Sequence, residues 1–164
     1  MNIRYIFSPL LLSLLVATIV TTTQPSSATV PEPGPAAFGE DEFRLFNNQL
    51  ISFSFEAHAN KKGHARGRAV FDNLSTQTQV VVKIDCLRVA GNEADGFEAL
   101  ITGTVLHSND PDFPKRADVI FAALDGQGIF TDMMTPLFLS PFDDCNTGAS
   151  PLTIFQVDNI QVEP

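Results

Sequence analysis

The sequence predicts an all-β protein, a single antiparallel β-sandwich or flattened barrel of about seven to eight strands, preceded by a signal peptide and a Pro-rich linker. Three observations support this fold class. From Leu50 onward, apolar and polar residues alternate with a period of two. Turn signals rich in Gly, Asn and Asp separate the alternating segments. No amphipathic helical period of useful length follows residue 28.

Residues 1–28 have the features of a secretory signal peptide. Arg4 supplies the positive charge, and residues 6–20 form an apolar run with few interruptions. The small residues Ser26, Ser27 and Ala28 predict cleavage after Ala28. The alternative is an uncleaved membrane anchor, but the run is short for a membrane span. Because no later segment is long enough to cross a bilayer, we expect a secreted or periplasmic protein with no span in the mature chain.

Residues 29–49 are predicted to be a Pro-rich linker and N-terminal segment, with the β-domain in residues 50–164. Pro31, Pro33 and Pro35 favour extended, solvated backbone. The acidic triplet at residues 40–42 predicts a short helical turn that continues through Phe46.

The first predicted hairpin joins residues 51–59 to residues 64–71. A turn at residues 60–63, with Gly63 in the left-handed bulge position, gives paired residues whose numbers sum to 124. In this register Phe53 meets Phe71 on the apolar face, and Glu56 meets Arg68 as an opposite-charge structural pair on the polar face. A shift of one residue would move Arg68 into the core.

The second predicted hairpin follows the strongest strand, residues 79–89. A two-residue loop at Gly91-Asn92 would pair Cys86 with Phe97, but it would also place Asp85 opposite Glu98. That like-charge pair leaves open a longer loop or a bulge near residues 95–96. The remaining chain predicts a loop at 107–116, a buried strand at 117–124, a turn at 125–128, an edge strand at 131–139 weakened by its proline, a loop at 140–151 and one or two short strands at 154–162.

Cys86 and Cys145 are predicted to form a disulfide. An even number of cysteines in an exported chain is typical of a disulfide-bonded domain. Two buried free thiols are the alternative.

Several strings in the order found here resemble a group of small secreted bacterial β-domain proteins without assigned function. Residues 53–57 match its F-x-F-x-A strand, residues 82–94 are similar to its V-x-C-L-x-V-x-G-N-x-A hairpin, and Asn159 to Val162 read N-I-Q-V. The resemblance covers most of residues 50–162. It implies a β fold and export, and it supplies no catalytic residues.

The composition restricts the partners. With Arg4 removed, nine basic and nineteen acidic residues give the mature chain a formal charge of −10. An acidic surface repels phosphate backbones and anionic membranes, so we expect no nucleic-acid partner. The partner is otherwise unknown, and we expect a monomer.

Candidate chemistry is sparse. His58 and His64 share a polar hairpin face with two arginines, which makes a poor metal site. We expect no cofactor; calcium is the weak alternative. Its oxygen ligands would come from acidic loops, and the candidates are Asp110, Asp112, Asp125, Asp143 and Asp144.

Three functions remain open. The first is a non-enzymatic envelope or extracellular module with a binding or structural role. The second is a carrier that holds a small apolar ligand inside a Phe-lined barrel. The third is a secreted hydrolase or isomerase with its site near His107 or Asp143. Because G-x-S-x-G is absent and both cysteines are committed to the disulfide, an enzyme is disfavoured.

Processing after Ala28 predicts an optical signature. The chain has 14 Phe, no Trp and one Tyr, and that Tyr is Tyr5, inside the signal peptide. The processed protein should therefore absorb almost no light at 280 nm beyond its disulfide. An absorbance spectrum of the purified exported protein tests this, and a strong 280 nm band would contradict cleavage after Ala28.

Overall fold

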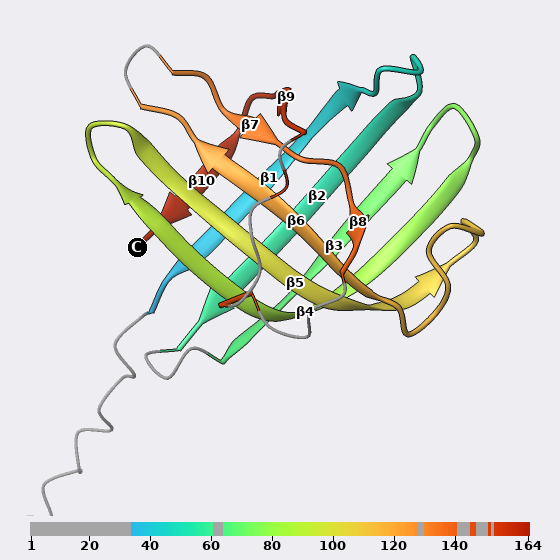
Figure 1. The fold of residues 1–164 in the computed structure, drawn as a ribbon, viewed down its shortest axis with the longest axis horizontal. Coiled ribbons are helices and arrows are strands. Elements are labelled where there is room, and N and C mark those ends of the chain that lie inside the picture. The colour runs from blue at the N-terminus through green and yellow to red at the C-terminus, as the bar shows by residue number, and fades with distance from the viewer. Residues whose placement is uncertain (1–33, 61–63, 128–129, 141–144, 147–150, 152) are drawn as a thin grey trace, which may run out of the picture. The chain divides into compact units, whose positions relative to one another are not determined.

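The computed structural model describes residues 34–60, 64–127, 130–140, 145–146, 151 and 153–164. These residues form a single antiparallel sheet of ten strands, curled into a half-barrel (Figure 1). The predicted signal peptide lies outside the described residues. No helix in the described part of the chain is long and apolar enough to cross a membrane. The strands are β1 (Ala36–Arg44), β2 (Leu50–Ala59), β3 (Ala65–Asn73), β4 (Thr78–Asn92), β5 (Gly96–Ser108), β6 (Asp118–Asp125), β7 (Met133–Met134), β8 (Phe138–Leu139), β9 (Phe155–Gln156) and β10 (Ile160–Glu163).

The strand order is β10-β1-β2-β3-β4-β5-β6-β7-β9, with β8 also paired to β6. Figure 1 shows β1, β2 and β3 crossing the direction of β5 and β6, so the sheet folds over on itself. The all-β antiparallel prediction is confirmed. The predicted strand number was too low because β1 was not predicted and the expected strand at 131–139 is divided into β7 and β8.

The segment before Leu50 is a strand, which corrects the predicted linker and helical turn. β1 pairs along its whole length with β2, from Ala36↔His58 to Arg44↔Leu50, and its first part pairs with β10. Ala37 and Phe43 are buried, whereas Glu40 and Glu42 are exposed on the opposite face. Burial on one face of the sheet therefore outweighs the local preference of an acidic triplet for a helix start.

The predicted register of the β2–β3 hairpin is confirmed. Phe53 pairs with Phe71 and Glu56 pairs with Arg68. The predicted bulge turn at residues 61–63 lies outside the described residues. Glu56 makes its close charged contact with His58, where Nε2 and Oε1 are 2.8 Å apart, rather than with its cross-strand neighbour.

The two-residue loop in the second hairpin was wrong, and the longer loop is observed. Asn92 pairs with Gly96, and residues 93–95 form the turn. The Asn92 side chain explains the length, because its Oδ1 accepts hydrogen bonds from the N–H groups of Ala94 (2.8 Å) and Asp95 (3.1 Å). Asp85 sits at an irregularity in the ladder and contacts Lys83 instead of opposing Glu98.

The C-terminal strands agree in outline with the sequence. β6 is buried as predicted, and the expected edge strand is divided into β7 and β8 by a segment that contains Pro136. Pro has no N–H for a ladder bond, which explains the interruption. Ile160 and Val162 of β10 are buried, as predicted.

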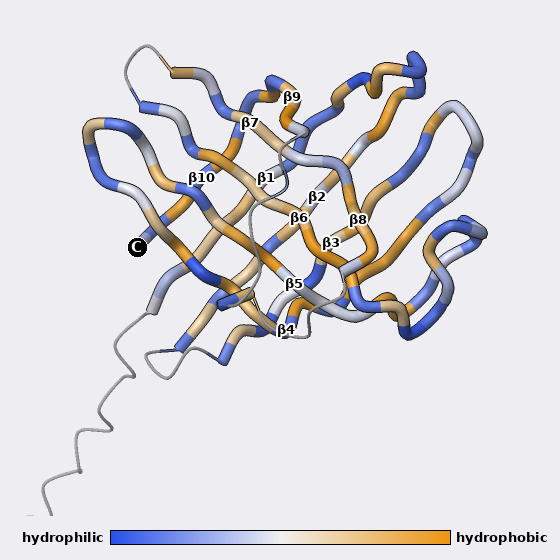
Figure 2. The backbone as a smooth tube through the Cα atoms, in the orientation of Figure 1, coloured by the Kyte–Doolittle hydropathy of each residue, from blue (hydrophilic) through white to orange (hydrophobic). Residues whose placement is uncertain are grey.

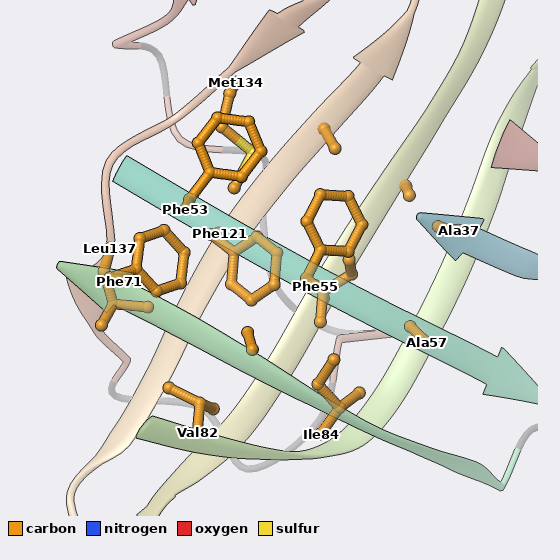
Figure 3. Packing of buried hydrophobic residues seen from close by; sticks show 14 of the residues in the cluster. Ala37, Phe53, Phe55, Ala57, Phe71, Val82, Ile84, Phe121, Met134 and Leu137 are labelled. Carbon is orange, nitrogen blue, oxygen red and sulfur yellow. The ribbon is translucent and has the colours of Figure 1, made fainter. Parts of the chain in front are cut away.

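Phenylalanine rings fill the interior of the curled sheet. Phe121 of β6 is 0% exposed and makes edge-on contacts with Phe55 of β2 (5.4 Å between ring centroids) and Phe71 of β3 (5.2 Å). Figure 3 shows these rings packed among aliphatic side chains. Figure 2 shows hydrophobic residues along the strand centres and hydrophilic residues in the connections. The centre of the half-barrel is therefore a packed core.

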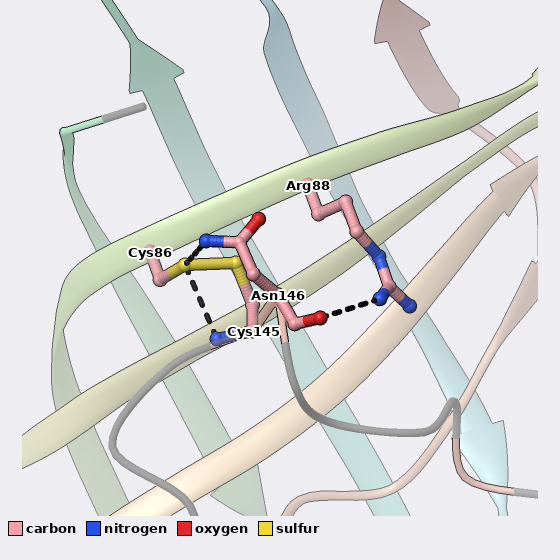
Figure 4. The surroundings of a disulfide bond; sticks show 4 residues. All are labelled: Cys86, Arg88, Cys145 and Asn146. Atoms are coloured by element: carbon pink, nitrogen blue, oxygen red, sulfur yellow. Dashed lines mark hydrogen bonds between the residues drawn. A yellow bond between two sulfur atoms is a disulfide. The ribbon is translucent and has the colours of Figure 1, made fainter. Parts of the chain in front are cut away.

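A disulfide fastens a C-terminal segment onto the outer face of the sheet. Cys86 of β4 is bonded to Cys145, as predicted, with their Cα atoms 5.7 Å apart. Figure 4 shows the bond beside Arg88 and Asn146. Both cysteines pack with Leu100, Ile120 and other residues in a second apolar cluster. A disulfide indicates an oxidising, extracytoplasmic environment.

Carboxylates join β10 to the far edge of the curled sheet. The Ile160 N–H donates to Oδ2 of Asp132 (2.8 Å), whose Oδ1 accepts from the Gly126 N–H (3.0 Å). The Val162 N–H donates to Oδ2 of Asp125 (3.0 Å) at the end of β6. These side chains take the place of ladder hydrogen bonds between β10 and β6.

Removing this link should destabilise the domain. We expect Asp132→Ala to lower the free energy of unfolding by about 1–3 kcal/mol, because two backbone N–H groups lose a charged acceptor. Urea denaturation followed by far-UV circular dichroism measures the change. Asp158→Ala is the control, since that exposed side chain has no comparable role. Equal stability of the Asp132→Ala variant and the parent would show that the carboxylate link contributes nothing.

The disulfide should contribute more. It closes a loop with a sequence separation of 59 residues, and the chain-entropy model gives about 4 kcal/mol for a loop of that size. We expect the Cys86→Ala/Cys145→Ala double variant to show a correspondingly lower unfolding midpoint in urea. A midpoint within error of the oxidised parent would contradict this expectation.

Candidate functional site

The candidate site is a pocket at one mouth of the half-barrel. Three connections surround it: the β1–β2 turn (45–49), the β3–β4 turn (74–77) and the loop after β5 (109–117), which lie on the same side of Figure 1. Its volume is about 220 Å³. Loops at the end of a rigid β scaffold are common positions for binding sites.

The walls of the pocket are apolar. They come from strands β1 to β4 and from the β1–β2, β5–β6 and β7–β8 connections, so the pocket is continuous with the phenylalanine core. Val80 and Phe71 also belong to the buried core, whereas Phe113 and Leu45 are only partly buried. The main wall residues are Phe43, Ile51, Phe71, Val80, Phe113 and Leu137.

Side-chain hydrogen bonds hold the first two connections together. Oε1 of Gln49 accepts from the side-chain amides of Asn47 (3.0 Å) and Asn73 (3.3 Å). The hydroxyl of Ser75 accepts from the N–H of Leu50 (2.9 Å), and Oδ1 of Asn73 accepts from the N–H of Ser75 (3.1 Å). The β1–β2 and β3–β4 turns therefore form one polar network beside the pocket.

The third loop is joined to the same network. The Thr78 hydroxyl donates to Oδ2 of Asp110 (3.0 Å), and Oδ1 of Asp110 accepts from the Asp112 N–H (2.9 Å). Asn109 bonds to the backbone of the β3–β4 connection at both ends of its amide, accepting from Gln79 N–H and donating to Gln77 O. These contacts set the shape of the mouth before any ligand arrives, which lowers the entropic cost of binding.

Each of the three connections contains one non-glycine residue in the left-handed backbone region. These are Asn48 (φ 67°), Gln77 (φ 58°) and Arg116 (φ 72°). Such residues are uncommon, and they cluster at sites where the surrounding structure fixes an unusual backbone. The loops around the pocket are therefore tightly specified.

An exposed aromatic residue stands beside the mouth. Phe46 is 89% exposed, and its ring lies 5.2 Å from that of Phe155, which stacks on Phe43 in the pocket wall at 5.1 Å. Leu74, in the neighbouring turn, is 48% exposed. This end of the half-barrel thus presents apolar side chains to solvent next to an apolar pocket.

The structure separates the predicted calcium ligands. Asp110 and Asp112 lie at the rim of the pocket, whereas Asp125 lies in the link between β6 and β10. Asp143 and Asp144 fall outside the described residues. Among the residues with described positions, no group of three or more His, Cys, Asp or Glu side chains could hold a metal ion.

The three histidines lie on the β2–β3 hairpin and on β5. His107 is exposed on β5 opposite Val81, and His58 pairs with Arg66 on the β2–β3 hairpin. His64 is exposed at the start of the β3 side of that hairpin. Asp143, the second residue of the enzyme hypothesis, lies outside the described residues.

A larger hollow, of about 1050 Å³, lies along β1, β2 and β3. Its lining includes the exposed side chains of Glu40, Ser54, Glu56 and Arg68. These polar groups are solvated, and the charged lining residues are three acids, Glu40, Glu56 and Asp132, and one base, Arg68. We regard the smaller mouth pocket as the candidate site because apolar walls with a few polar groups are typical of ligand pockets.

Comparison with known proteins gives no relative. No protein-family model matches the chain, and neither a curated protein nor a solved structure shows significant similarity to it.

Sequence reasoning missed most of the mouth residues. Gln49, Asn73 and Asn109 form the network, and none of them was singled out beforehand. The sequence feature that could have pointed to them is the frequency of amide and hydroxyl residues in three segments. These segments are residues 47–49, 73–78 and 108–110. That feature predicts turns, but only the sheet topology places the three turns around one pocket.

Proposed function

We propose that this chain is an exported, non-enzymatic binding module whose ligand site is the mouth pocket. The observation that carries the proposal is an apolar pocket bordered by three connections that bond to one another through side chains. Rigid loops around an apolar hollow favour selective binding of one small apolar group. A secreted or periplasmic location fits the disulfide.

A ligand held deep inside the barrel is less well supported. The rings of Phe55, Phe71 and Phe121 occupy the space that such a ligand would need. The carrier hypothesis is therefore restricted to ligands bound at the mouth. Such a ligand is either a small molecule or one apolar group of a larger partner. A pocket of about 220 Å³ lies below the roughly 300–1,000 Å³ of most drug-sized ligand sites.

The lining also favours binding over catalysis. The described lining residues include carboxylates, amides and one hydroxyl, but no histidine, cysteine, serine or lysine. A nucleophile with an adjacent base is the usual basis of hydrolysis.

We also infer that the chain is related to the small secreted bacterial β-domain proteins whose sequence motifs it resembles. The order of these motifs along β2, β4 and β10 supports this inference.

Filling the pocket should abolish binding of a neutral apolar probe. We expect 1-hexanol to shift the amide NMR signals of Thr78, Val80 and Leu137 in the processed, disulfide-bonded protein. Leu45→Phe adds volume at the pocket wall and should weaken the affinity at least about tenfold, equivalent to 1.4 kcal/mol.

The matched control is Leu106→Phe, which makes the same change on an exposed side chain of β5 outside the pocket lining. It should leave the hexanol affinity within about twofold, well below the 1.4 kcal/mol step. The proposed function is wrong if hexanol shifts no mouth signal, or if both variants bind it as well as the parent does.

A further inference from the structure

We propose that the mouth pocket accepts a small amphiphile with an apolar body and a cationic ammonium head. This inference rests on the proposed function and adds the chemical class of the ligand. Its basis is the charge of the rim: the two charged side chains that line the pocket, Asp110 and Asp112, are both negative.

The two carboxylates differ in how they are used. Both oxygens of Asp110 accept hydrogen bonds inside the loop network, from the Thr78 hydroxyl and the Asp112 N–H. Those bonds fix the position of its charge without neutralising it. Asp112 is exposed, and the ion pairs found among the described residues, His58–Glu56 and Lys83–Asp85, lie elsewhere. Neither rim carboxylate takes part in an ion pair among the described residues, and both lie beside apolar walls.

The basic side chains at this end of the molecule are not part of the pocket lining. The Arg44 guanidinium donates to the Asn48 carbonyl at 3.4 Å. Lys115 and Arg116 are exposed in the third loop, and none of these three side chains lines the pocket. The charged side chains of the pocket lining that a bound ammonium group could contact are therefore the two carboxylates.

The size of the pocket limits the apolar body. An apolar cavity of about 150 Å³ in another protein holds benzene, and this pocket has about 220 Å³. A body of roughly six to eight carbon atoms therefore fits. Hexylamine, 1-hexanol and hexanoate share one six-carbon chain and carry a positive, neutral and negative head at pH 7, so they isolate the effect of the head.

The three probes should rank by the charge of the head group, with hexylamine binding most tightly and hexanoate most weakly. Charges near a protein surface interact weakly because water screens them, so we expect hexylamine to bind about three- to tenfold more tightly than hexanol. Hexanoate should bind more weakly than hexanol because the rim repels it. One molar salt should reduce the preference for the amine, since it shortens the screening length to about 3 Å.

Titrations followed by amide NMR test the inference. Asp112→Asn should reduce the amine-to-hexanol affinity ratio to about twofold or less, as expected for a surface ion pair. The control, Glu93→Gln, removes one negative charge from the β4–β5 turn at the other end of β4 and should leave the ratio unchanged. Leu45→Phe should weaken all three probes together.

The possible results distinguish the two proposals. If none of the three probes shifts the mouth signals, the proposed function itself fails. If hexanol binds but hexylamine binds no more tightly, or if Glu93→Gln lowers the ratio as much as Asp112→Asn, the ammonium inference is overturned and the binding module stands. Amine binding that persists in Leu45→Phe would show attraction to the acidic surface alone and would also overturn the inference.

Discussion

The structure depends on joining the two edges of a curled sheet that does not close by strand pairing. All four residues of β10 pair with β1, and no described strand pairs with the opposite edge of β10. The carboxylates of Asp132 and Asp125 accept the N–H groups of Ile160 and Val162. Unpaired backbone at an edge is a route to aggregation, and a carboxylate acceptor both satisfies it and places charge there. The inward faces of β2, β3 and β6 are thereby held against each other as one core.

A core filled in this way determines where a ligand can bind. Interiors pack at the density of organic crystals, so rings that meet at 5–6 Å leave no room for a guest between them. At the mouth, however, Leu45, Phe113 and Leu137 from the connections join the strand residues Phe43 and Val80 in the pocket lining. The pocket is the place where the apolar interior meets the polar connections. Its apolar walls and polar rim follow from that position.

Local patterns predicted the fold as far as local interactions decide it. The β2–β3 register followed from alternation and turn length, because a slip would bury Arg68. The second hairpin was misread because the Asn92 side chain, not the backbone, sets the turn. β1 was missed because Gly39 and Asp41 interrupt the apolar face. Gly39 is required there, since a Cβ would lie 2.5 Å from both Ile160 and the Phe55 ring. The mouth was not predictable, because its residues belong to connections far apart in the sequence and only the curl of the sheet brings them together.

This arrangement explains two features of the composition, the many phenylalanines and the excess of acidic residues. Phe has no polar group, so it fills a closed core without requiring a hydrogen-bond partner, whereas buried Trp and Tyr usually need one. Short amide, hydroxyl and carboxylate side chains in the connections make the hydrogen bonds instead. These bonds hold turns together and satisfy backbone N–H groups. Asp110 and Asp132 illustrate the same device at two places: one joins loops at the mouth and the other joins the edges of the sheet. An excess of acidic residues is therefore built into the way this half-barrel is held together, and the negative rim of its pocket is a consequence of that construction.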